Sequence, residues 1–356
     1  MKNRKWIKIV GVILLILCLL AVAGVFFAKG MVNRGASNLQ ENAVSQGEMI
    51  SEEPATQEEV EEGVIYYGGE KYRYNEEIYT VLFMGIDSYK GLGAEHTEEY
   101  GDQSDTNILF VINLKEKSIQ LISISRDTMT DVEVYTADGE YFNTVKSQLA
   151  LQYAYGDGKE KSCELMVKAV SNLMYGLPIH GYCAMSLHGI AVANDAVGGV
   201  KIVALEDIDE GGFRMKKGTE KLLKGKEARY YVMDRNKDVF ASNNLRMQRQ
   251  KQYLNAFADQ LKEKMQKDIT VPVKLYQALD DYMITDISLD EMSYLATLAL
   301  ECEFDTENIL NVAGKVEKKE GEKYEEYYVD EEALYQLILD VFYEKIKETD
   351  INVSAH

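Results

Sequence analysis

The stretch Ile78-Tyr79-Thr80-Val81-Leu82-Phe83-Met84-Gly85-Ile86-Asp87-Ser88 decides the fold that this sequence predicts. Its first nine residues are mostly β-branched, aromatic or otherwise apolar, which is typical of a strand buried inside a sheet. Asp87 and Ser88 interrupt that run and predict a loop where the strand ends. The sequence therefore places an acidic side chain at one edge of a central sheet.

Segments after this strand alternate between strand and helix patterns. Residues 107–113 and 118–124 predict two more apolar strands, joined by the hairpin connection Leu114-Lys115-Glu116-Lys117. Further strands are expected at 181–187 and 200–205, and helices at 146–155, 162–175, 187–197, 219–231 and 245–264. This interleaving favours an α/β fold of the α+β sandwich type, in which helices cover a central, mostly antiparallel sheet.

The N-terminal residues predict a membrane anchor. Residues 7–28 are almost entirely apolar and are long enough to cross about 30 Å of hydrocarbon. Basic residues are concentrated at the start of this run, which places the N-terminus in the cytoplasm and the rest of the chain outside the cell. A cleaved signal peptide is the alternative. Because the run exceeds a typical signal core, we expect a retained, single-pass helix in the cell membrane.

Composition divides the chain into four parts. Residues 1–29 hold the cytoplasmic tail and the transmembrane signal anchor, and residues 30–63 have the polar composition of an extracellular stalk. Residues 64–266 carry the candidate site. Residues 267–356 form a C-terminal α/β extension to which the sequence assigns no role, with helices expected at 271–280, 288–298 and 331–347 and a strand pair at 308–316 and 324–329.

The charge balance restricts the possible partners. The chain has 39 Lys and Arg against 59 Asp and Glu, a net charge of −20. It lacks the basic face that sequence-independent nucleic-acid binding requires, so we expect no nucleic-acid partner. The four histidines form no cluster, and no Cys/His spacing resembles a zinc site. Beyond the anchor, Cys163, Cys183 and Cys302 leave open whether two of them form a disulfide.

Two aspartates at strand ends predict a cation site. Asp87 follows one apolar strand, and Asp105 precedes the next, so the two carboxylates can meet at one edge of the sheet. One or two carboxylates, with water and phosphate oxygens, suit Mg²⁺. The alternative is that each aspartate caps a turn through its side chain, which is the commoner role of Asp at a strand end.

Arginines gather near the same edge in an otherwise acidic chain, which favours a phosphate ligand. Arg126-Asp127 ends the third strand, where the arginine could bind a phosphate and the aspartate could orient it. Arg246 and Gln250 share a face at the start of a long helix, where the helix dipole also favours an anion. Arg249 points partly elsewhere, and Arg235 precedes this group. The alternatives are a local ion pair and a solvated basic helix face.

These candidates lie in blocks that together resemble the LytR-CpsA-Psr family of cell-envelope proteins. The blocks are Gly85-Ile86-Asp87, Ser104-Asp105-Thr106, Ser123-Ile124-Ser125-Arg126-Asp127 and Arg246-Met247-Gln248-Arg249-Gln250. The resemblance covers about residues 80–264 and the N-terminal anchor. The segment Asn194-Asp195-Ala196-Val197-Gly198-Gly199-Val200 resembles a further family segment, for which we expect a structural role.

The resemblance implies a membrane-anchored extracellular phosphotransferase of Gram-positive bacteria. Such enzymes move a glycopolymer, a teichoic acid or capsular-type polysaccharide, from undecaprenyl diphosphate to peptidoglycan and release undecaprenyl phosphate. The family holds the lipid in an apolar tunnel between sheet and helices and grips the diphosphate with arginines and Mg²⁺. By position, Asp87 and Asp105 would be the magnesium ligands, and Arg126, Arg235, Arg246 and Gln250 the diphosphate contacts. Arg126 and Asp87 would be the catalytic residues, with Asp127 and Arg249 in support.

Three departures from the family pattern keep other functions open. Met233 stands where an arginine is common, Ser125 replaces a proline, and Asn243 replaces an aspartate. Together with the acidic Asp234, the missing arginine favours the alternative of a non-catalytic protein that binds a polyprenyl lipid or a wall glycan. A transcriptional attenuator is a further alternative, against which both the expected topology and the negative charge argue.

Overall fold

The computed structural model describes most of the chain beyond the predicted stalk. It covers residues 32–38, 64–88, 92, 102–136, 138–233, 242–301, 309–318 and 324–346, without the side chains of residues 210, 242–247, 299 and 300. The predicted membrane anchor lies outside these ranges. Within them, no helix combines the length and the apolar composition needed to span a bilayer.

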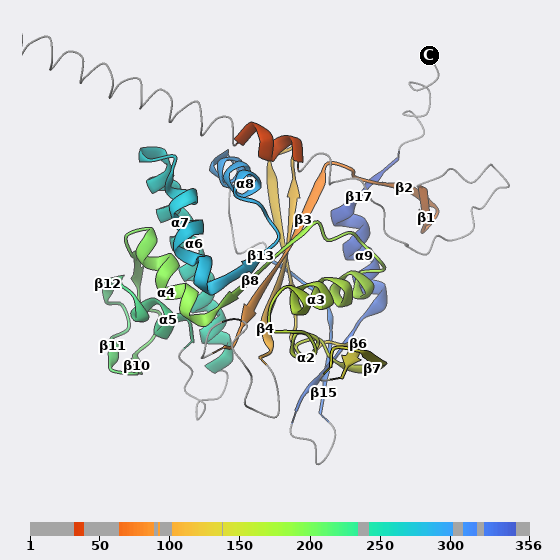
Figure 1. Cartoon of the computed structure of the whole chain (residues 1–356), viewed down its shortest axis with the longest axis horizontal. Coiled ribbons are helices and arrows are strands. Elements are labelled where there is room, and N and C mark those ends of the chain that lie inside the picture. The colour runs from red at the N-terminus through yellow and green to blue at the C-terminus, as the bar shows by residue number, and fades with distance from the viewer. Residues whose placement is uncertain are drawn as a thin grey trace, which may run out of the picture.

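Six strands in the described part of the chain form a central mixed sheet (Figure 1). They are β3 (Ile78–Ile86), β4 (Ser104–Asn113), β5 (Ser118–Ile124), β8 (Gly181–Ser186), β13 (Met283–Thr285) and β14 (Leu310–Asn311). Their spatial order is β13-β8-β3-β4-β5-β14. β3 pairs with β8 and β5 with β14 in parallel, and the other three pairings are antiparallel. The predicted central sheet is confirmed, as a mixed sheet.

Helices cover both faces of the sheet because side chains of its central strand alternate between two cores. Leu82, Met84 and Ile86 are fully buried on the face covered by α3 (Glu160–Leu173) and α9 (Glu331–Phe342). Tyr79 and Val81 pack on the other face, under α8 (Leu289–Glu301). In Figure 1, α3 and α9 lie to the right of the sheet and α8 lies to its left.

A second core lies beside the sheet. It contains α4 (Leu187–Ala196), α5 (Lys226–Met233), α6 (Ser242–Lys267) and two strand pairs, β9 (Val200–Val203) with β12 (Glu220–Leu223) and β10 (Ile208–Glu210) with β11 (Phe213–Met215). Asn194 Nδ2 donates to the Leu223 carbonyl at 2.9 Å, and Asp195 Oδ1 accepts from the Gly225 amide at 2.7 Å. These bonds place the start of α5 at the end of α4, which gives the segment from 194 to 200 the structural role expected of it.

The segment predicted as a C-terminal extension contributes to the same sheet. After α7 (Val271–Leu279), β13 and β14 pair at its two opposite edges. β17 (Tyr343–Lys345) pairs with β2 (Glu70–Tyr74), which also pairs with β1 (Val64–Tyr67). Leu334, Ile338 and Phe342 of α9 are fully buried in the main core. The boundary expected at residue 266 therefore does not separate two sheets.

Two segments predicted as helices are partly strands. Residues 146–155 contain the end of β7 (Tyr141–Gln148), which pairs with β6 (Met129–Tyr135), before the short helix α2 (Leu151–Ala154). Residues 219–231 contain β12 before α5 begins. In short segments the spacing of apolar residues fits both a helix and a strand. Pairing with a segment distant in sequence decides which of the two forms.

The two cysteines in the described ranges, Cys163 and Cys183, are free thiols. Cys163 on α3 packs in the main core, where Tyr182 and Ala184 of β8 also lie. Because side chains alternate along a strand, Cys183 points to the opposite face of the sheet. The pairing that the sequence left open is therefore not formed between these two. Cys18 and Cys302 lie outside the described residues.

Residues 32–38, expected as part of the stalk, form a short helix next to α8 (Figure 1). Arg34 Nε lies 2.7 Å from Asp290 Oδ2. Gly35 approaches the Asp290 backbone so closely that a Cβ atom would lie 2.2 Å from its carbonyl oxygen. The missing side chain of Gly35 thus permits this contact, and the first part of the predicted stalk is attached to the folded domain.

Candidate functional site

The candidate site lies at one edge of the central sheet, where β3, β5 and β8 end and β4 begins. The parallel pairing of β3 with β8 brings their carboxyl ends together, and β4 runs antiparallel to both β3 and β5. Asp87 follows β3, Asp105 lies at the start of β4, and Arg126 follows β5. The observed strand pairing therefore brings these three residues to one edge of the sheet, where their positions at strand ends led us to expect them.

A bulge in the pairing of β3 and β4 sets the position of Asp105. Gly85 pairs with Thr106, but Ile86 pairs with Ser104, so Asp105 is an extra residue inside β4. Bulges turn a side chain out of the regular alternation. The Asp105 side chain is 37% exposed, whereas Ser104 is buried. A Cβ at Gly85 would lie 3.0 Å from the Thr106 Cβ, which explains a glycine beside the bulge.

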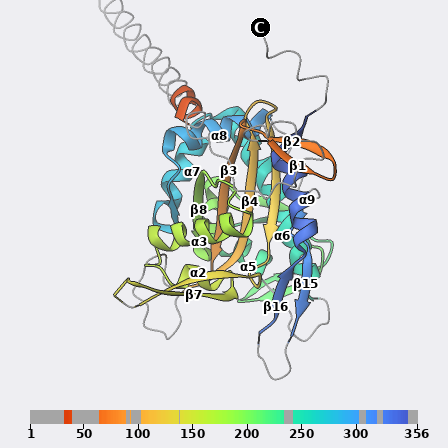
Figure 2. The same ribbon diagram turned by 90° about the vertical axis from the view of Figure 1, so that its right-hand side faces the viewer.

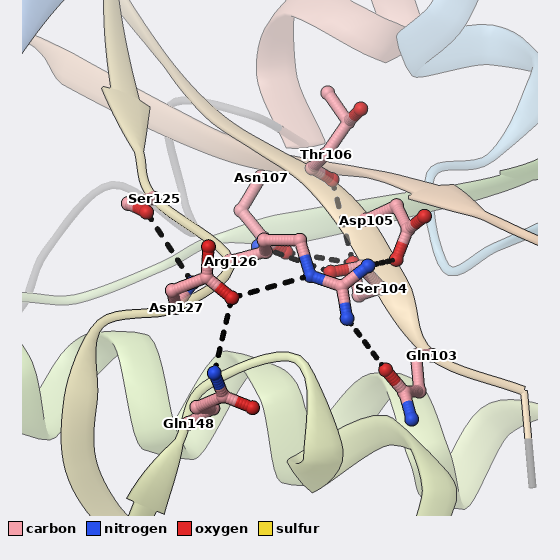
Figure 3. A network of polar contacts seen from close by, with 9 residues as sticks. All are labelled: Gln103, Ser104, Asp105, Thr106, Asn107, Ser125, Arg126, Asp127 and Gln148. Atoms are coloured by element: carbon pink, nitrogen blue, oxygen red, sulfur yellow. Dashed lines mark hydrogen bonds and ion pairs between the residues drawn. The ribbon is translucent and has the colours of Figure 1, made fainter. Parts of the chain in front are cut away.

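The Arg126 guanidinium is held from three sides (Figure 3). It donates to Asp105 Oδ1, and its Nη2 lies 2.7 Å from Gln103 Oε1. Its Nε lies 3.6 Å from Asp127 Oδ1. The side chain remains 36% exposed. Arg126 is therefore oriented by its neighbours and still accessible to an anion at the sheet edge.

The turn after β5 fixes the backbone of this arginine. The Thr128 amide donates to the Ser125 carbonyl at 3.2 Å, and the Arg126 carbonyl accepts from the Ala150 amide at 3.0 Å. Ser125 Oγ accepts from the Asp127 amide at 3.3 Å. Serine side chains form such local turns readily. The serine found where the family often has proline therefore supports the turn through a hydrogen bond.

Asp127 connects Arg126 to the C-terminal segment. Gln148 Nε2 donates to Asp127 Oδ1 at 3.1 Å and to the Glu325 carbonyl at 2.7 Å (Figure 3 shows the first contact). The Tyr327 amide, in β16 (Glu326–Val329), donates to the Asp127 carbonyl at 2.9 Å. β16 pairs with β15 (Gly314–Glu317), and this hairpin lies at the same end of the molecule as β7 (Figure 2). The C-terminal segment thus supports the site from outside the sheet.

The Asp87 carboxylate has an unusual environment. Burial raises its pKa, and the carboxylates of Asp105 and Asp102 raise it further, while Arg126 lowers it. Its Oδ1 is buried and has no hydrogen-bond partner in the described part of the chain. If Asp87 capped a turn through this oxygen, the oxygen would accept a hydrogen bond, and the described residues provide none. A buried carboxylate oxygen beside a second carboxylate is instead suited to a cation.

The carboxylates at this edge fit a cation that also binds the phosphates of a substrate. The described residues contain no group of three or more His, Cys, Asp or Glu arranged to hold a metal. Asp87 and Asp105 together provide two carboxylates at one edge. Mg²⁺ commonly uses one or two carboxylates, with waters and substrate phosphates as the remaining ligands. The donor set suits Mg²⁺ and lacks the nitrogen and sulfur ligands that zinc prefers.

Arg249 and Gln250 lie at the junction of α5 and α6. Arg249 is 2% exposed, its Nε lies 2.9 Å from Glu206 Oε1, and it donates to the Tyr231 carbonyl. Gln250 Nε2 donates to the Val232 carbonyl at 3.1 Å. The last carbonyls of a helix lack partners within it, so these two side chains complete the end of α5. Arg249 therefore stabilises the junction of α5 and α6, and its predicted support of a phosphate site remains a prediction.

The other predicted phosphate contacts are only partly visible. Arg235 lies outside the described residues. Arg246 lies in the first turns of α6, but its side chain is not among the described atoms. The structure therefore brings Asp87, Asp105, Arg126 and Asp127 together and leaves the placement of Arg235 and Arg246 a prediction.

Sequence reasoning gave no role to Gln103 or Gln148, which hold the Arg126–Asp127 pair. Both contacts join residues more than twenty positions apart. Gln103 directly precedes the Ser-Asp-Thr block, so its place at the start of β4 was a signal. Gln148 gave none, because it lies in a segment expected to be helical.

Comparison with known proteins identifies the family of the chain. Residues 37–339 match the LytR_cpsA_psr family. The chain belongs to this family. The match confirms the resemblance seen in the motifs, and it extends across the boundary expected at residue 266.

Relatives of this LytR-CpsA-Psr protein include transferases of the bacterial envelope. A polyisoprenyl-teichoic acid–peptidoglycan teichoic acid transferase, TagU, of Oceanobacillus iheyensis is 26% identical over 83% of this chain and 82% of its own. A TagU of Halalkalibacterium halodurans is 27% identical over 60% of this chain, and the match spans 62% of that relative. The crystal structure of Bacillus subtilis TagV superposes with a TM-score of 0.55 at 24% identity, covering 75% of this chain and 98% of TagV, which shows the shared fold.

Proposed function

We propose that this LytR-CpsA-Psr protein is a membrane-anchored, extracellular phosphotransferase. It moves a glycopolymer from a polyprenyl diphosphate carrier to peptidoglycan. The observation that carries the proposal is the juxtaposition of Arg126 with Asp87 and Asp105 at one sheet edge. Relatives named as teichoic acid transferases support the same class of reaction.

The reaction requires one bond to form and one to break at phosphorus. An acceptor hydroxyl on peptidoglycan would lose its proton, in net to solvent, and its oxygen would bond to the phosphorus that carries the glycopolymer. The bond from that phosphorus to the bridging oxygen of the diphosphate would break, and the carrier would leave as its monophosphate. Phosphoryl transfer depends mainly on positioning and charge neutralisation, which a fixed but accessible arginine such as Arg126 supplies.

Asp87 and Asp105 are the residues that would hold Mg²⁺. When bound there, the ion would neutralise charge on the diphosphate oxygens. Asp105 already bonds Arg126, so the arginine and the cation site share one carboxylate. This sharing would keep the anion-binding and cation-binding groups in contact with the same diphosphate.

The sheet offers an apolar wall on which the carrier lipid could lie. Phe83 and Ile108 are paired across β3 and β4, and Phe110 lies on the same face of β4. All three side chains are only partly buried. Partly exposed aromatic and aliphatic groups at adjacent positions suit a hydrocarbon chain. They support the lipid tunnel expected between the sheet and the helices.

A second candidate function is binding of the lipid-linked glycan without transfer. It is favoured by the contacts of Arg126, whose guanidinium is bound to protein carboxylates, and by the apolar Met233 on α5. A protein of this kind would bind the carrier diphosphate and never release the monophosphate.

A transfer assay separates the two functions. Full-length protein is supplied with lipid-linked glycopolymer, peptidoglycan and Mg²⁺, and release of polyprenyl phosphate is measured. We expect Arg126→Ala to reduce transfer by about a hundredfold to a thousandfold with an unchanged thermal midpoint. Arg214→Ala is the matched control, because this arginine is exposed and pairs with Asp209 on the surface. Equal turnover by Arg126→Ala and the wild type would sink the proposal.

A further inference from the structure

Four aromatic side chains are exposed in the described part of the chain, and all four lie on two hairpins beside the candidate site. Tyr141 and Phe142 begin β7, Tyr328 lies in β16, and Tyr324 lies just before β16. Single exposed apolar residues are common on protein surfaces, but a group of them marks a binding surface. The two hairpins are therefore candidates for contact with a partner.

The β6–β7 and β15–β16 hairpins meet at Asp127, the residue that orients Arg126. Thr128, just before β6, forms a parallel bridge with Tyr327 of β16. The Tyr327 amide and the Gln148 side chain, at the end of β7, both donate to Asp127. Figure 2 shows both hairpins at one end of the molecule. The exposed aromatic residues therefore extend outward from the candidate site.

The strand register places Tyr141 and Tyr328 on the same face of the paired strands. Bridged residues point to one side of a sheet, so Tyr327 shares a side with Thr128, and Tyr328 points to the other side. Tyr135 of β6 comes seven residues after Thr128, so it also lies on that other side. It pairs with Tyr141. One face thus carries aromatic rings at both of its ends.

This face is open to solvent. Asp131 and Lys146 form a cross-strand pair on it and are 60% and 68% exposed. Thr130 and Val132, which point to the opposite face, are buried. The face that carries Tyr141 is therefore the one that a partner can reach.

The exposed rings are held in fixed positions. The Tyr141 hydroxyl lies 2.9 Å from Thr144 Oγ1, and its ring meets the Tyr135 ring edge-on with the centroids 5.9 Å apart. The Tyr328 hydroxyl donates to Glu326 Oε2 at 2.7 Å. Rings that are already fixed lose little conformational entropy when a ligand binds.

Phe142 is the extra residue of a bulge in β7. Tyr141 pairs with Tyr135 and Asn143 with Val134, so Phe142 has no partner in β6. Bulges turn a side chain away from the regular alternation, and this side chain is 69% exposed. A phenyl ring has no polar group that water could satisfy. Its exposure next to Tyr141 therefore indicates contact with a partner.

The spacing of the rings fits an extended polymer. Tyr141 lies seven residues from Gln148 along β7, which at 3.4 Å per residue is about 24 Å. Tyr328 lies at the near end, because its neighbour Tyr327 binds Asp127. A small molecule cannot span this length. A chain of linked rings can contact both ends of the surface.

The charge of the hairpins favours an uncharged chain. Residues 129–136, 138–148, 314–318 and 324–329 carry seven carboxylates and three lysines. A glycopolymer linked by phosphodiesters would be repelled by this excess of negative charge. The sugar rings of a peptidoglycan strand carry no charge. They present C–H groups that pack on aromatic rings, and hydroxyls that donate to carboxylates.

A bilayer is another partner that exposed aromatic residues can fit, and two observations disfavour it. The helix of residues 32–38, which follows the predicted anchor, lies at the opposite end of the molecule from both hairpins (Figure 2). Anionic lipid headgroups would also repel the excess of carboxylates on the hairpins. Both observations favour a partner on the side away from the predicted anchor.

We propose that Tyr141, Phe142 and Tyr328, which we call the aromatic surface, bind the glycan strand of peptidoglycan. The inference rests on the proposed function, because this strand is its acceptor. A strand that stacks on the aromatic surface is held along the edge where Asp127 orients Arg126. Its hydroxyl groups are then at a high effective concentration beside the candidate site.

The first test measures glycan binding without transfer. Full-length protein in detergent is titrated by calorimetry with a soluble chitin oligomer, an uncharged analogue of the strand, and is sedimented with purified peptidoglycan. Replacing both Tyr141 and Phe142 by alanine should weaken binding about tenfold to a hundredfold, and Tyr328→Ala about threefold to tenfold. These residues are exposed, so the thermal midpoint should stay unchanged.

Two matched variants control this measurement. Tyr141→Phe keeps the ring and should retain most of the affinity. Leu222→Ala removes an exposed apolar side chain from β12, away from both hairpins, and should have no effect. A wild type that binds neither glycan probe, or equal affinities in Leu222→Ala and the double alanine variant, overturns the proposal.

Further probes exclude the other occupants. A glycerol phosphodiester oligomer represents the glycopolymer, and phosphatidylglycerol vesicles represent the membrane. We expect the double alanine variant to bind both as the wild type does. A loss for either probe that equals the loss for the chitin oligomer overturns the proposal. A dimer that only this variant abolishes, seen by light scattering, would assign the surface to a second copy of the chain instead.

Transfer kinetics separate this inference from the proposed function. With a soluble peptidoglycan fragment as acceptor, the double alanine variant should raise the KM for the acceptor about tenfold and leave kcat unchanged. A wild type that binds glycan but transfers nothing contradicts the proposed function and leaves the aromatic surface intact. Transfer by a double variant whose glycan affinity and acceptor KM are unaltered overturns the inference and leaves the proposed function intact.

Discussion

At the scale of single residues, the charge of Asp87 works against the stability of the fold. Its folded pKa is raised by burial and by neighbouring carboxylates. The folded protein therefore binds the proton more tightly than the unfolded chain does, and stability falls as pH rises through this window. We expect Asp87→Asn to raise the thermal midpoint at pH 7 without Mg²⁺. The gain should disappear as pH falls towards 3.8, the ordinary pKa of the group.

Magnesium should reverse the order of the two thermal midpoints, so that the wild type becomes more stable than Asp87→Asn. If Asp87 is a ligand, Mg²⁺ binds only the folded wild type and raises its thermal midpoint, while Asp87→Asn gains little. Asp209→Asn is the control, because its side chain is 66% exposed on the surface. Identical responses to Mg²⁺ in the wild type and Asp87→Asn would remove Asp87 from the metal site.

Gln148 is expected to control the protonation of Asp127. Burial raises the pKa of Asp127, Arg126 lowers it, and Glu325 and Asp105 raise it. Gln148→Leu removes a donor that favours the charged carboxylate, so the pKa should rise further. Because protonated Asp127 holds Arg126 less well, transfer should be lost at a higher pH than in the wild type.

The pH profile of transfer distinguishes this role from simple packing. Gln148→Lys retains a donor towards Asp127 and adds a positive charge, which lowers the pKa of this carboxylate, so the acid limb of the profile should move to lower pH, opposite to Gln148→Leu. A Gln148→Leu protein whose activity falls equally at every pH would show that Gln148 only stabilises the loop.

The sequence could predict the residues at strand ends but not the contacts that orient them. Asp87, Asp105 and Arg126 each adjoin an apolar run, so the order of the strands was enough to bring them together. Gln148 supports the site through a contact between segments that only the folded chain brings close. Arg249 illustrates the opposite case, because helical spacing alone does not show that its guanidinium is buried against Glu206.

At the scale of elements, the end of α5 depends on α6. The Arg249 side chain is 2% exposed and contacts the Tyr231 carbonyl and the Glu206 carboxylate. Arg249→Leu would remove both contacts. Because Glu206 is 30% exposed, water can replace the lost contact at its carboxylate, and the main cost is the unsatisfied buried carbonyl, about 1–3 kcal/mol. We expect that loss in the free energy of unfolding, measured in urea. Arg214→Leu, which breaks an exposed pair, should cost at most about 1 kcal/mol.

A loss below about 1 kcal/mol in Arg249→Leu would show that α6 does not anchor α5. Phosphate binding provides an independent measurement on the same variant. Arg249 contacts protein groups rather than an open edge, so any effect on binding should follow the loss of folded protein.

Strands with a continuous apolar run were predicted almost to the residue, whereas short amphipathic segments were not. β3 and β5 have the bounds expected from the sequence, because burial on both faces leaves little alternative. β7 alternates between exposed and half-buried residues, and its pairing with β6 depends on a partner outside the segment. Site residues were therefore predictable where they adjoin a strand with a continuous apolar run.

At the scale of the whole molecule, the N-terminal and C-terminal parts share one sheet and one core. The segment after residue 266 provides both edge strands, the buried face of α9 and the Tyr327 contact to Asp127. Composition gave no sign of this, because pairing between distant segments leaves no local pattern. The site at the sheet edge therefore depends on residues from nearly the full length of the described chain.

A single buried leucine in the C-terminal segment can test this dependence. Leu339 of α9 is fully buried against the sheet, so Leu339→Ala should cost about 2–5 kcal/mol. If the sheet and α9 unfold together, one transition should move to lower temperature in both near-UV and far-UV circular dichroism. Leu222→Ala, at a leucine that is 44% exposed on β12, should change the midpoint little. Two transitions, of which Leu339→Ala moves only one, would show that α9 belongs to a separately folding unit.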